Sequence, residues 1–252
     1  MEYIRNPKCE CQKYLDFNDI TNRIKERSSI NTYVLDGYIH EGGSSRECPC
    51  HKEWRLNNRY EIFAKQKDLP SLDKLQGLKY MGDGNLFTKF ITIPTVMENK
   101  PQYKDTIFYC VGGRVTQKTT SAAKLIHEIF YKGMYPEYFV FNELIQALNE
   151  NDNKPTLQKI RDADYLIIDD CFAADVINFK SCYNLILTEI LKRKKPTILL
   201  TRRSFEDISH NNHYDQDLVE DLKARVEYKN SMLCFMDNIE NLMLKENGPI
   251  DL

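Results

Sequence analysis

The chain carries Gly112-Gly113-Arg114-Val115-Thr116-Gln117-Lys118-Thr119-Thr120 between an apolar run over residues 106–111 and a run with helical periodicity over residues 121–131. In this strand, loop and helix context, the pattern G-x-x-x-x-G-K-[ST] indicates a loop that binds nucleotide phosphates. Gln117 stands where the second glycine belongs, so the loop must accommodate a Cβ atom at a position that often needs glycine. We therefore expect ATP binding and, at most, weak ATPase activity. The expected nucleotide-binding residues are Gly112, Gly113, Thr116, Gln117, Lys118, Thr119 and Thr120.

The second decisive segment is Tyr165-Leu166-Ile167-Ile168-Asp169-Asp170. Its apolar residues predict a buried strand, and parallel α/β sheets bind ligands at the carboxyl ends of such strands. We expect Thr119 and Asp169 to bind Mg²⁺ and Asp170 to polarise the attacking water beside the γ-phosphate. We also expect Lys118, Thr119 and Asp169 to lie at adjacent strand ends of one sheet.

Strands and helices alternate from residue 106 onward, which is typical of a parallel sheet covered by helices on both faces. We therefore predict an α/β fold. The predicted strands cover residues 106–111, 138–141, 165–169, 197–201 and 231–236. The predicted helices cover residues 121–131, 142–149, 156–161, 180–192 and 217–226. The chain ends soon after the last predicted strand, so we expect no helical lid at the C-terminus.

Composition divides the chain into three expected regions. Residues 1–66 form a small N-terminal domain, with a helix over residues 16–27 and a strand over residues 32–39. Residues 67–105 are punctuated by glycine and proline and predict an irregular connector, whose many leucines and phenylalanines require it to pack on the next domain. Residues 106–252 form the expected ATPase domain.

The formal net charge of −2 favours no particular polymer, so any contact with nucleic acid requires a local patch. No apolar stretch is long enough to span a membrane, and the first residues lack the apolar core of a signal peptide. We therefore expect a cytoplasmic protein without a membrane partner.

The eight cysteines are unevenly distributed. Four lie in two close pairs near the start of the chain, and the others are scattered among apolar residues, as is typical of buried cysteine. The N-terminal region is too small to bury a large core, and four thiolates suit a tetrahedral structural Zn²⁺ site. The expected ligands are Cys9, Cys11, Cys48 and Cys50, with His51 as the alternative to Cys50 and His40 as a further candidate.

A third segment, Lys195-Pro196-Thr197-Ile198-Leu199-Leu200-Thr201-Arg202-Arg203-Ser204-Phe205, follows the paired carboxylates. With these three segments, the chain resembles the AAA+ helicase loaders of the DnaC/DnaI type, whose close relatives are the IstB-type transposition-helper ATPases. The resemblance covers nearly the whole chain. Its departures from the family pattern, at Val115, Gln117 and Arg202, bear on catalytic rate and leave the fold unaffected; such divergence suits a phage-encoded loader.

The resemblance implies catalytic roles for Asp170, Arg202 and Arg225. Arg202 lies where the sensor strand of the family usually presents asparagine, and Arg225 lies in the segment that resembles the helix carrying an arginine finger between subunits. From the residues alone, Arg202 is equally well explained as a helix-capping or DNA-contacting arginine. Arg225 is also explained by a surface ion pair with Glu220 or Asp221.

For function, the resemblance implies a module at residues 1–66 that binds the replicative DNA helicase. It further implies an oligomer formed with ATP that delivers this helicase to single-stranded DNA during DNA replication. The expected cofactors are ATP, Mg²⁺ and Zn²⁺. Two alternatives stay open: an IstB-like transposition helper that binds duplex DNA, and a non-hydrolysing P-loop adaptor in which the zinc module performs all recognition.

The zinc hypothesis predicts that freshly purified protein carries about one zinc ion per chain. Cys9→Ser or Cys48→Ser should release the metal and unfold mainly residues 1–66, because a domain with a small core depends on its metal. Metal analysis and limited proteolysis measure both effects. Undamaged protein that contains no zinc would show that the four cysteines have another role.

Overall fold

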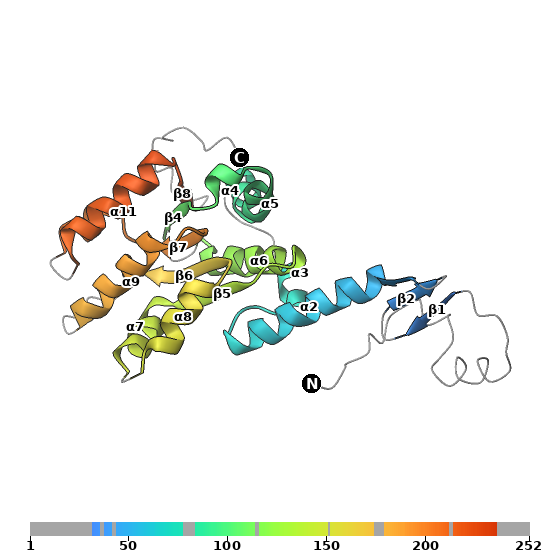
Figure 1. Ribbon diagram of the computed structural model, residues 1–252. Helices are drawn as coiled ribbons and strands as arrows, with labels where there is room; N and C mark the ends of the chain where they lie inside the picture. Colours follow the sequence, from blue (N-terminus) through green and yellow to red (C-terminus); the bar gives the residue numbers. More distant parts are fainter. Residues whose placement is uncertain are drawn as a thin grey trace. The chain divides into compact units, whose positions relative to one another are not determined.

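The computed structural model describes residues 32–35, 38–41, 44–77, 84–113, 116–150, 152–173, 179–211 and 214–235. The chain forms two compact units, Met1–Ile62 and Phe63–Leu252 (Figure 1). The helix expected over residues 16–27 lies outside the described residues. Among those that are described, no helix is long and apolar enough to cross a membrane.

The described part of the first unit begins with a three-stranded antiparallel sheet. Its strands are β1 (Thr32–Leu35), β2 (Tyr38–Glu41) and β3 (Ser44–Glu47), and they pair in sequence order. The single strand predicted over residues 32–39 is wrong, because β1 and β2 are separate antiparallel strands. The intervening sequence Asp36-Gly37 is a dipeptide that favours two-residue hairpin turns, and it is the sequence signal for two strands in place of one. The helix α2 (Pro49–Gln66) follows and was not predicted.

The second unit contains a five-stranded sheet in which every strand pair is parallel, in the order β5-β6-β7-β4-β8. The strands are β4 (Ile107–Gly112), β5 (Pro136–Val140), β6 (Tyr165–Cys171), β7 (Thr197–Thr201) and β8 (Met232–Phe235). The predicted parallel sheet is thus confirmed. β4, β6 and β7 are buried along almost their whole length, which explains why their sequences are continuous apolar runs.

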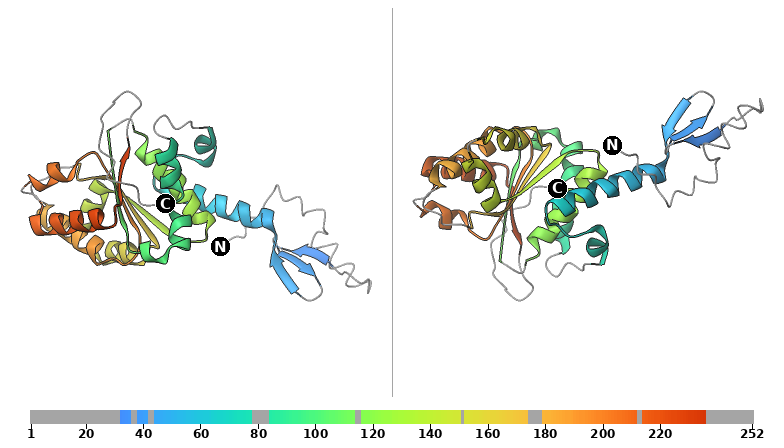
Figure 2. Two further views of the ribbon diagram at one scale, coloured as in Figure 1. Left: turned by 90° about the horizontal axis from the view of Figure 1, so that it is seen from above. Right: turned by 90° about the horizontal axis from the view of Figure 1, so that it is seen from below.

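Helices cover both faces of this sheet, as Figure 2 shows. The helices of the second half are α6 (Lys118–Tyr131), α7 (Phe141–Asn149), α8 (Lys154–Asp162), α9 (Lys180–Lys192), α10 (Phe205–Ser209) and α11 (Gln216–Tyr228). α6 lies on one face, and α7, α9 and α11 lie on the other. Only α10 was not predicted; it is short and starts with a capping box between Ser204 and Asp207.

The connector is largely helical where the structure describes it, so the irregular segment predicted there is wrong. It contains α3 (Leu72–Gly77), α4 (Gly84–Ile91), α5 (Ile93–Asn99) and a 3-10 turn (Pro101–Tyr103). Three of its described glycines and prolines stand at helix ends, where they fit: Gly77 ends α3, Gly84 begins α4, and Pro94 lies in the first turn of α5. These helices contact α6 and bury Phe90 and Met97, so the apolar residues of the connector complete the core.

Arg193 joins three elements at the amino edge of the sheet. Its guanidinium donates to the carbonyl oxygens of Ile160, Ala163 (3.0 Å) and Pro196 (3.4 Å) and to the hydroxyl oxygen of Thr197 (3.2 Å). The residue is buried, so water cannot replace these donors. The ends of α8 and α9 and the start of β7 are therefore held together by one side chain.

We predict that Arg193→Leu lowers the free energy of unfolding by about 3 kcal/mol, because buried carbonyl groups lose a charged donor. Urea denaturation followed by circular dichroism measures this change. Lys194→Leu is the matched control, since Lys194 is exposed and should change stability by less than about 0.5 kcal/mol. Equal effects of the two substitutions would contradict this role of Arg193.

Candidate functional site

Gln117, in the loop between β4 and α6, has the left-handed backbone conformation that favours the glycine of the sequence pattern. Gln117, the residue before the first turn of α6, is left-handed, with φ 55° and ψ 27°. This conformation favours glycine and costs a residue with a side chain roughly 1 kcal/mol. The absence of the glycine therefore costs free energy, but Gln117 adopts the left-handed conformation.

Gly112 is needed for a different reason, which is close packing. A Cβ atom on Gly112 would lie 2.5 Å from the backbone oxygen of Phe235 and 2.7 Å from the hydroxyl oxygen of Thr116. Phe235 ends β8, which pairs with β4, so the backbone there has little room to shift. Gly113, by contrast, would meet nothing within 4 Å.

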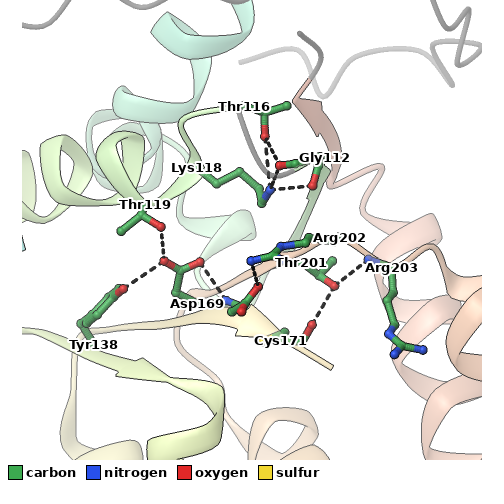
Figure 3. Close-up of polar contacts among 12 residues, drawn as sticks. Gly112, Thr116, Lys118, Thr119, Tyr138, Asp169, Cys171, Thr201, Arg202 and Arg203 are labelled. Atoms are coloured by element: carbon green, nitrogen blue, oxygen red, sulfur yellow. Dashed lines mark hydrogen bonds and ion pairs between the residues drawn. The ribbon is translucent and has the colours of Figure 1, made fainter. Parts of the chain in front are cut away.

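Lys118 begins α6, and its ammonium group points back to the loop. It donates to the carbonyl oxygens of Gly112 (2.5 Å) and Gly113 (2.6 Å) and to the hydroxyl oxygen of Thr116 (3.2 Å) (Figure 3). Burial lowers the pKa of Lys118, and the nearby Asp169 carboxylate opposes this shift. A partly desolvated ammonium group at the N-terminus of a helix favours an anionic ligand such as a phosphate.

Asp169 lies at the carboxyl end of β6 and contacts the first turn of α6. The hydroxyl group of Thr119 donates to Asp169 Oδ2 at 2.5 Å, and the hydroxyl group of Tyr138 donates to the same oxygen at 3.0 Å. The expectation of adjacent strand ends is wrong, because β7 lies between β4 and β6. The two segments meet because α6 passes from the end of β4 to β6, and its first turn reaches over the intervening strand.

The second carboxylate, Asp170, faces a different partner. Its backbone is left-handed, with φ 53°, and the pairing of β6 with β7 is irregular between Ile168 and Cys171. This bulge separates the two acids, because Asp169 bonds Thr119 whereas Asp170 forms an ion pair with Arg202 at 3.1 Å. The side chains of Asp170 and Arg202 are both more than a third exposed, so a ligand can reach this ion pair and replace one of its partners.

The donor set around Asp169 fits a magnesium ion. Mg²⁺ prefers hard oxygen ligands and binds through one or two carboxylates together with substrate phosphates. Thr119 donates its hydroxyl hydrogen to Asp169, which leaves the lone pairs of its oxygen free for a metal. The structure thus brings together the two residues that the sequence assigned to Mg²⁺.

Arg225 lies away from this site, at the amino edge of the sheet. Its guanidinium donates to the carbonyl oxygens of Leu191 (2.6 Å), Asp105 (2.9 Å) and Arg193 (3.1 Å), and it pairs with the Asp105 carboxylate at 3.6 Å. The ion-pair partner is therefore Asp105, whereas the alternative to the finger that the sequence left open was Glu220 or Asp221. A finger that reaches another subunit would first have to give up these bonds.

The predicted zinc ligands are described only in part. Cys9, Cys11 and the side chain of Cys50 lie outside the described residues, whereas Cys48 and His51 are buried. Within the described ranges, no group of three or more His, Cys, Asp or Glu side chains is arranged to hold a metal ion. The zinc site stays a prediction.

Comparison with known proteins identifies the fold. No protein-family model and no curated protein matches the sequence. Among solved structures, the crystal structure of DnaI aligns with a TM-score of 0.50 and 18% identity, over 66% of this chain and 88% of DnaI. Over the aligned part, this chain has the fold of DnaI. A structure of the DnaC helicase loader aligns with a TM-score of 0.46 and 17% identity, over 58% of this chain and 86% of its own.

The likeness to DnaI agrees with the predicted α/β fold, in which helices flank a parallel sheet; the predicted zinc-stapled N-terminal domain stays a prediction. Sequence analysis missed one polar residue of the site, Tyr138. A tyrosine within an apolar strand is more often a core residue, and no motif distinguishes it. Only the pairing of β5 with β6, which the sequence does not specify, brings its hydroxyl group to Asp169.

We predict that Gly112→Ala lowers the free energy of unfolding by about 2 kcal/mol, because the added Cβ atom meets the backbone of β8. Gly113→Ala is the matched control and should change stability by less than about 0.5 kcal/mol. Thermal or urea denaturation of both variants measures the difference. If Gly112→Ala is as stable as the wild type, the close packing of β4 against the end of β8 is not a constraint on the loop.

Proposed function

We propose that this protein binds Mg·ATP at the carboxyl edge of its sheet and loads a replicative DNA helicase onto single-stranded DNA during DNA replication. One observation carries the nucleotide part of the proposal: Thr119 and Asp169, from segments far apart in the sequence, share a hydrogen bond beside Lys118. The DnaI-like fold supports the loader part.

Each residue of the site has a role in this proposal. Lys118 and the amides of the loop bind the phosphates, and Thr119 and Asp169 hold the metal ion. Asp170 orients and polarises the attacking water. Arg202, which forms an ion pair with Asp170 at 3.1 Å, exchanges this carboxylate for the γ-phosphate when ATP is bound. Mg²⁺, when bound, neutralises the charge that develops on the phosphate oxygens.

The ion pair between Asp170 and Arg202 argues that ATP turnover is slow. An attacking water has to displace the Arg202 guanidinium group from the Asp170 carboxylate, since the two groups form an ion pair at 3.1 Å. We propose that ATP acts mainly as a conformational and assembly switch. In the oligomer that the resemblance implies, Arg225 would act as the finger toward a neighbouring subunit, in exchange for its present bonds to Leu191, Asp105 and Arg193.

Helicase binding is assigned to the first unit, together with the zinc site. In its described part, Tyr38 is 43% exposed, and Tyr38 and Trp54 flank the buried His51 ring, with ring centroids at 6.4 and 5.7 Å. Aromatic residues of this kind are frequent anchors in protein interfaces. Tyr14 and Phe17, which we also expected to contact the helicase, lie outside the described residues.

Calorimetry with the full chain should detect binding of Mg·ATP. Lys118→Ala should weaken it at least about tenfold, because the phosphates lose a charge-assisted hydrogen bond. Asp170→Asn should reduce hydrolysis more than binding, since it acts on the water and leaves the metal ligands intact. If wild-type protein binds no Mg·ATP, the non-hydrolysing adaptor is the better description.

A helicase-loading assay on single-stranded DNA coated with binding protein tests the biological role. The full chain should bind a replicative helicase and promote its loading, and Trp54→Ala should weaken helicase binding while leaving ATP binding unchanged. Binding to single-stranded DNA should fall with added salt, as phosphate contacts do. A chain that binds a transposase or duplex DNA tightly, and no replicative helicase, would favour the IstB-like alternative.

A further inference from the structure

Tyr138 is a buried tyrosine on β5 whose hydroxyl group donates to Asp169 Oδ2 at 3.0 Å. In the register of β5 and β6, Tyr138 lies opposite Ile167. Asp169 is the next residue of β6 on the same face, which is within the diagonal reach of an aromatic side chain. The strand register therefore directs Tyr138 to the metal-binding carboxylate, as Figure 3 shows.

The protein already occupies most of the acceptor positions of Asp169. Oδ2 accepts from Thr119 and Tyr138, and Oδ1 accepts from the backbone N–H of Asp170 at 2.8 Å. An ionised carboxylate offers about four acceptor positions. These three hydrogen bonds fix the plane of the carboxylate and leave room for one further ligand, which is what a metal ion or a metal-bound water needs.

The Tyr138 hydroxyl group is a permanent donor in this arrangement. The hydroxyl group supplies the hydrogen of this bond, because the carboxylate oxygen 3.0 Å away is an acceptor. Its side chain is only 3% exposed, so bulk water cannot readily supply a substitute donor. Loss of the hydroxyl would leave a buried carboxylate oxygen with one hydrogen bond fewer and with more rotational freedom.

We propose that Tyr138 is a positioning residue for the divalent metal: its hydroxyl group holds the Asp169 carboxylate in the orientation in which Asp169 and Thr119 bind Mg²⁺ together. The inference rests on the proposed nucleotide site and adds the residue that sets the metal affinity of that site. Groups that orient a metal ligand typically change metal affinity by 10- to 100-fold when they are removed.

Tyr135 provides a matched control from the same region of the chain. Its hydroxyl group also donates to a carboxylate, Glu137 Oε2 at 3.1 Å, but Glu137 pairs with Lys67 and belongs to no metal-binding set. Tyr135→Phe therefore removes a hydrogen bond of the same type without touching Asp169.

The test is a Mg²⁺ titration of the full chain bound to ATP that carries a fluorescent ribose label, with the midpoint of the titration as the readout. Tyr138→Phe should raise the Mg²⁺ midpoint about tenfold, and Tyr135→Phe should leave it unchanged. Tyr138→Met, which also lacks the hydroxyl group but packs differently, should shift the midpoint in the same direction. A purely structural role would lower the melting temperature without moving the midpoint.

The outcomes separate the two proposals. If the wild type shows Mg²⁺-dependent nucleotide binding and Tyr138→Phe has the same midpoint, the positioning role is wrong and the nucleotide site stands. If the wild type shows no Mg²⁺-dependent nucleotide binding, both the nucleotide site and the positioning role of Tyr138 are wrong. In an Asp169→Asn background, Tyr138→Phe should cause no further shift, because the hydroxyl acts through that carboxylate; an additional tenfold shift would also contradict the inference.

Discussion

The hydrogen bonds to the Asp169 carboxylate connect parts of the second unit that the sheet topology keeps apart. β7 separates β4 from β6, so strand pairing alone does not join the phosphate loop to the acidic strand. Thr119, in the first turn of α6, makes that connection at 2.5 Å, and Tyr138 supports it from β5. A change at Asp169 therefore affects the loop, the acidic strand and the edge strand together, which is the coupling that a nucleotide-dependent switch requires.

The two edges of the sheet differ in their side-chain contacts and in their backbone conformation. At the amino edge, Arg193 and Arg225 donate to carbonyl oxygens at the ends of α8 and α9 and just before β4. Side-chain hydrogen bonds therefore hold these elements together. At the carboxyl edge, Gln117 and Asp170 are both left-handed, and the ion pair of Asp170 with Arg202 is partly exposed. Backbone strain, together with an ion pair that a ligand can replace, is typical of a ligand site.

The sequence predicted the features that depend on local pattern. Continuous apolar runs identified β4, β6 and β7, and the Gly-x-x-x-x-x-Lys-Thr pattern located the loop, because burial on both faces and phosphate binding each impose a residue type. The sequence did not predict the features that depend on tertiary contacts. The glycines and prolines of the connector suggested an irregular chain, yet Gly77, Gly84 and Pro94 stand at the ends of helices that contact α6. Likewise, nothing in the sequence specifies the strand order, which decides that Tyr138 meets Asp169 and that Arg225 lies at the opposite edge.

The most direct test of the central claim is a crystal structure of the full chain with Mg²⁺ and a non-hydrolysable ATP analogue. The β- and γ-phosphates should lie against Lys118 and the amides between Gly113 and Thr119, and the metal ion should contact the hydroxyl oxygen of Thr119 and lie beside the Asp169 carboxylate. A nucleotide bound elsewhere, or a loop in which Lys118 keeps its bonds to Gly112 and Gly113 while the analogue is saturating, would contradict the assignment of this edge as a nucleotide site.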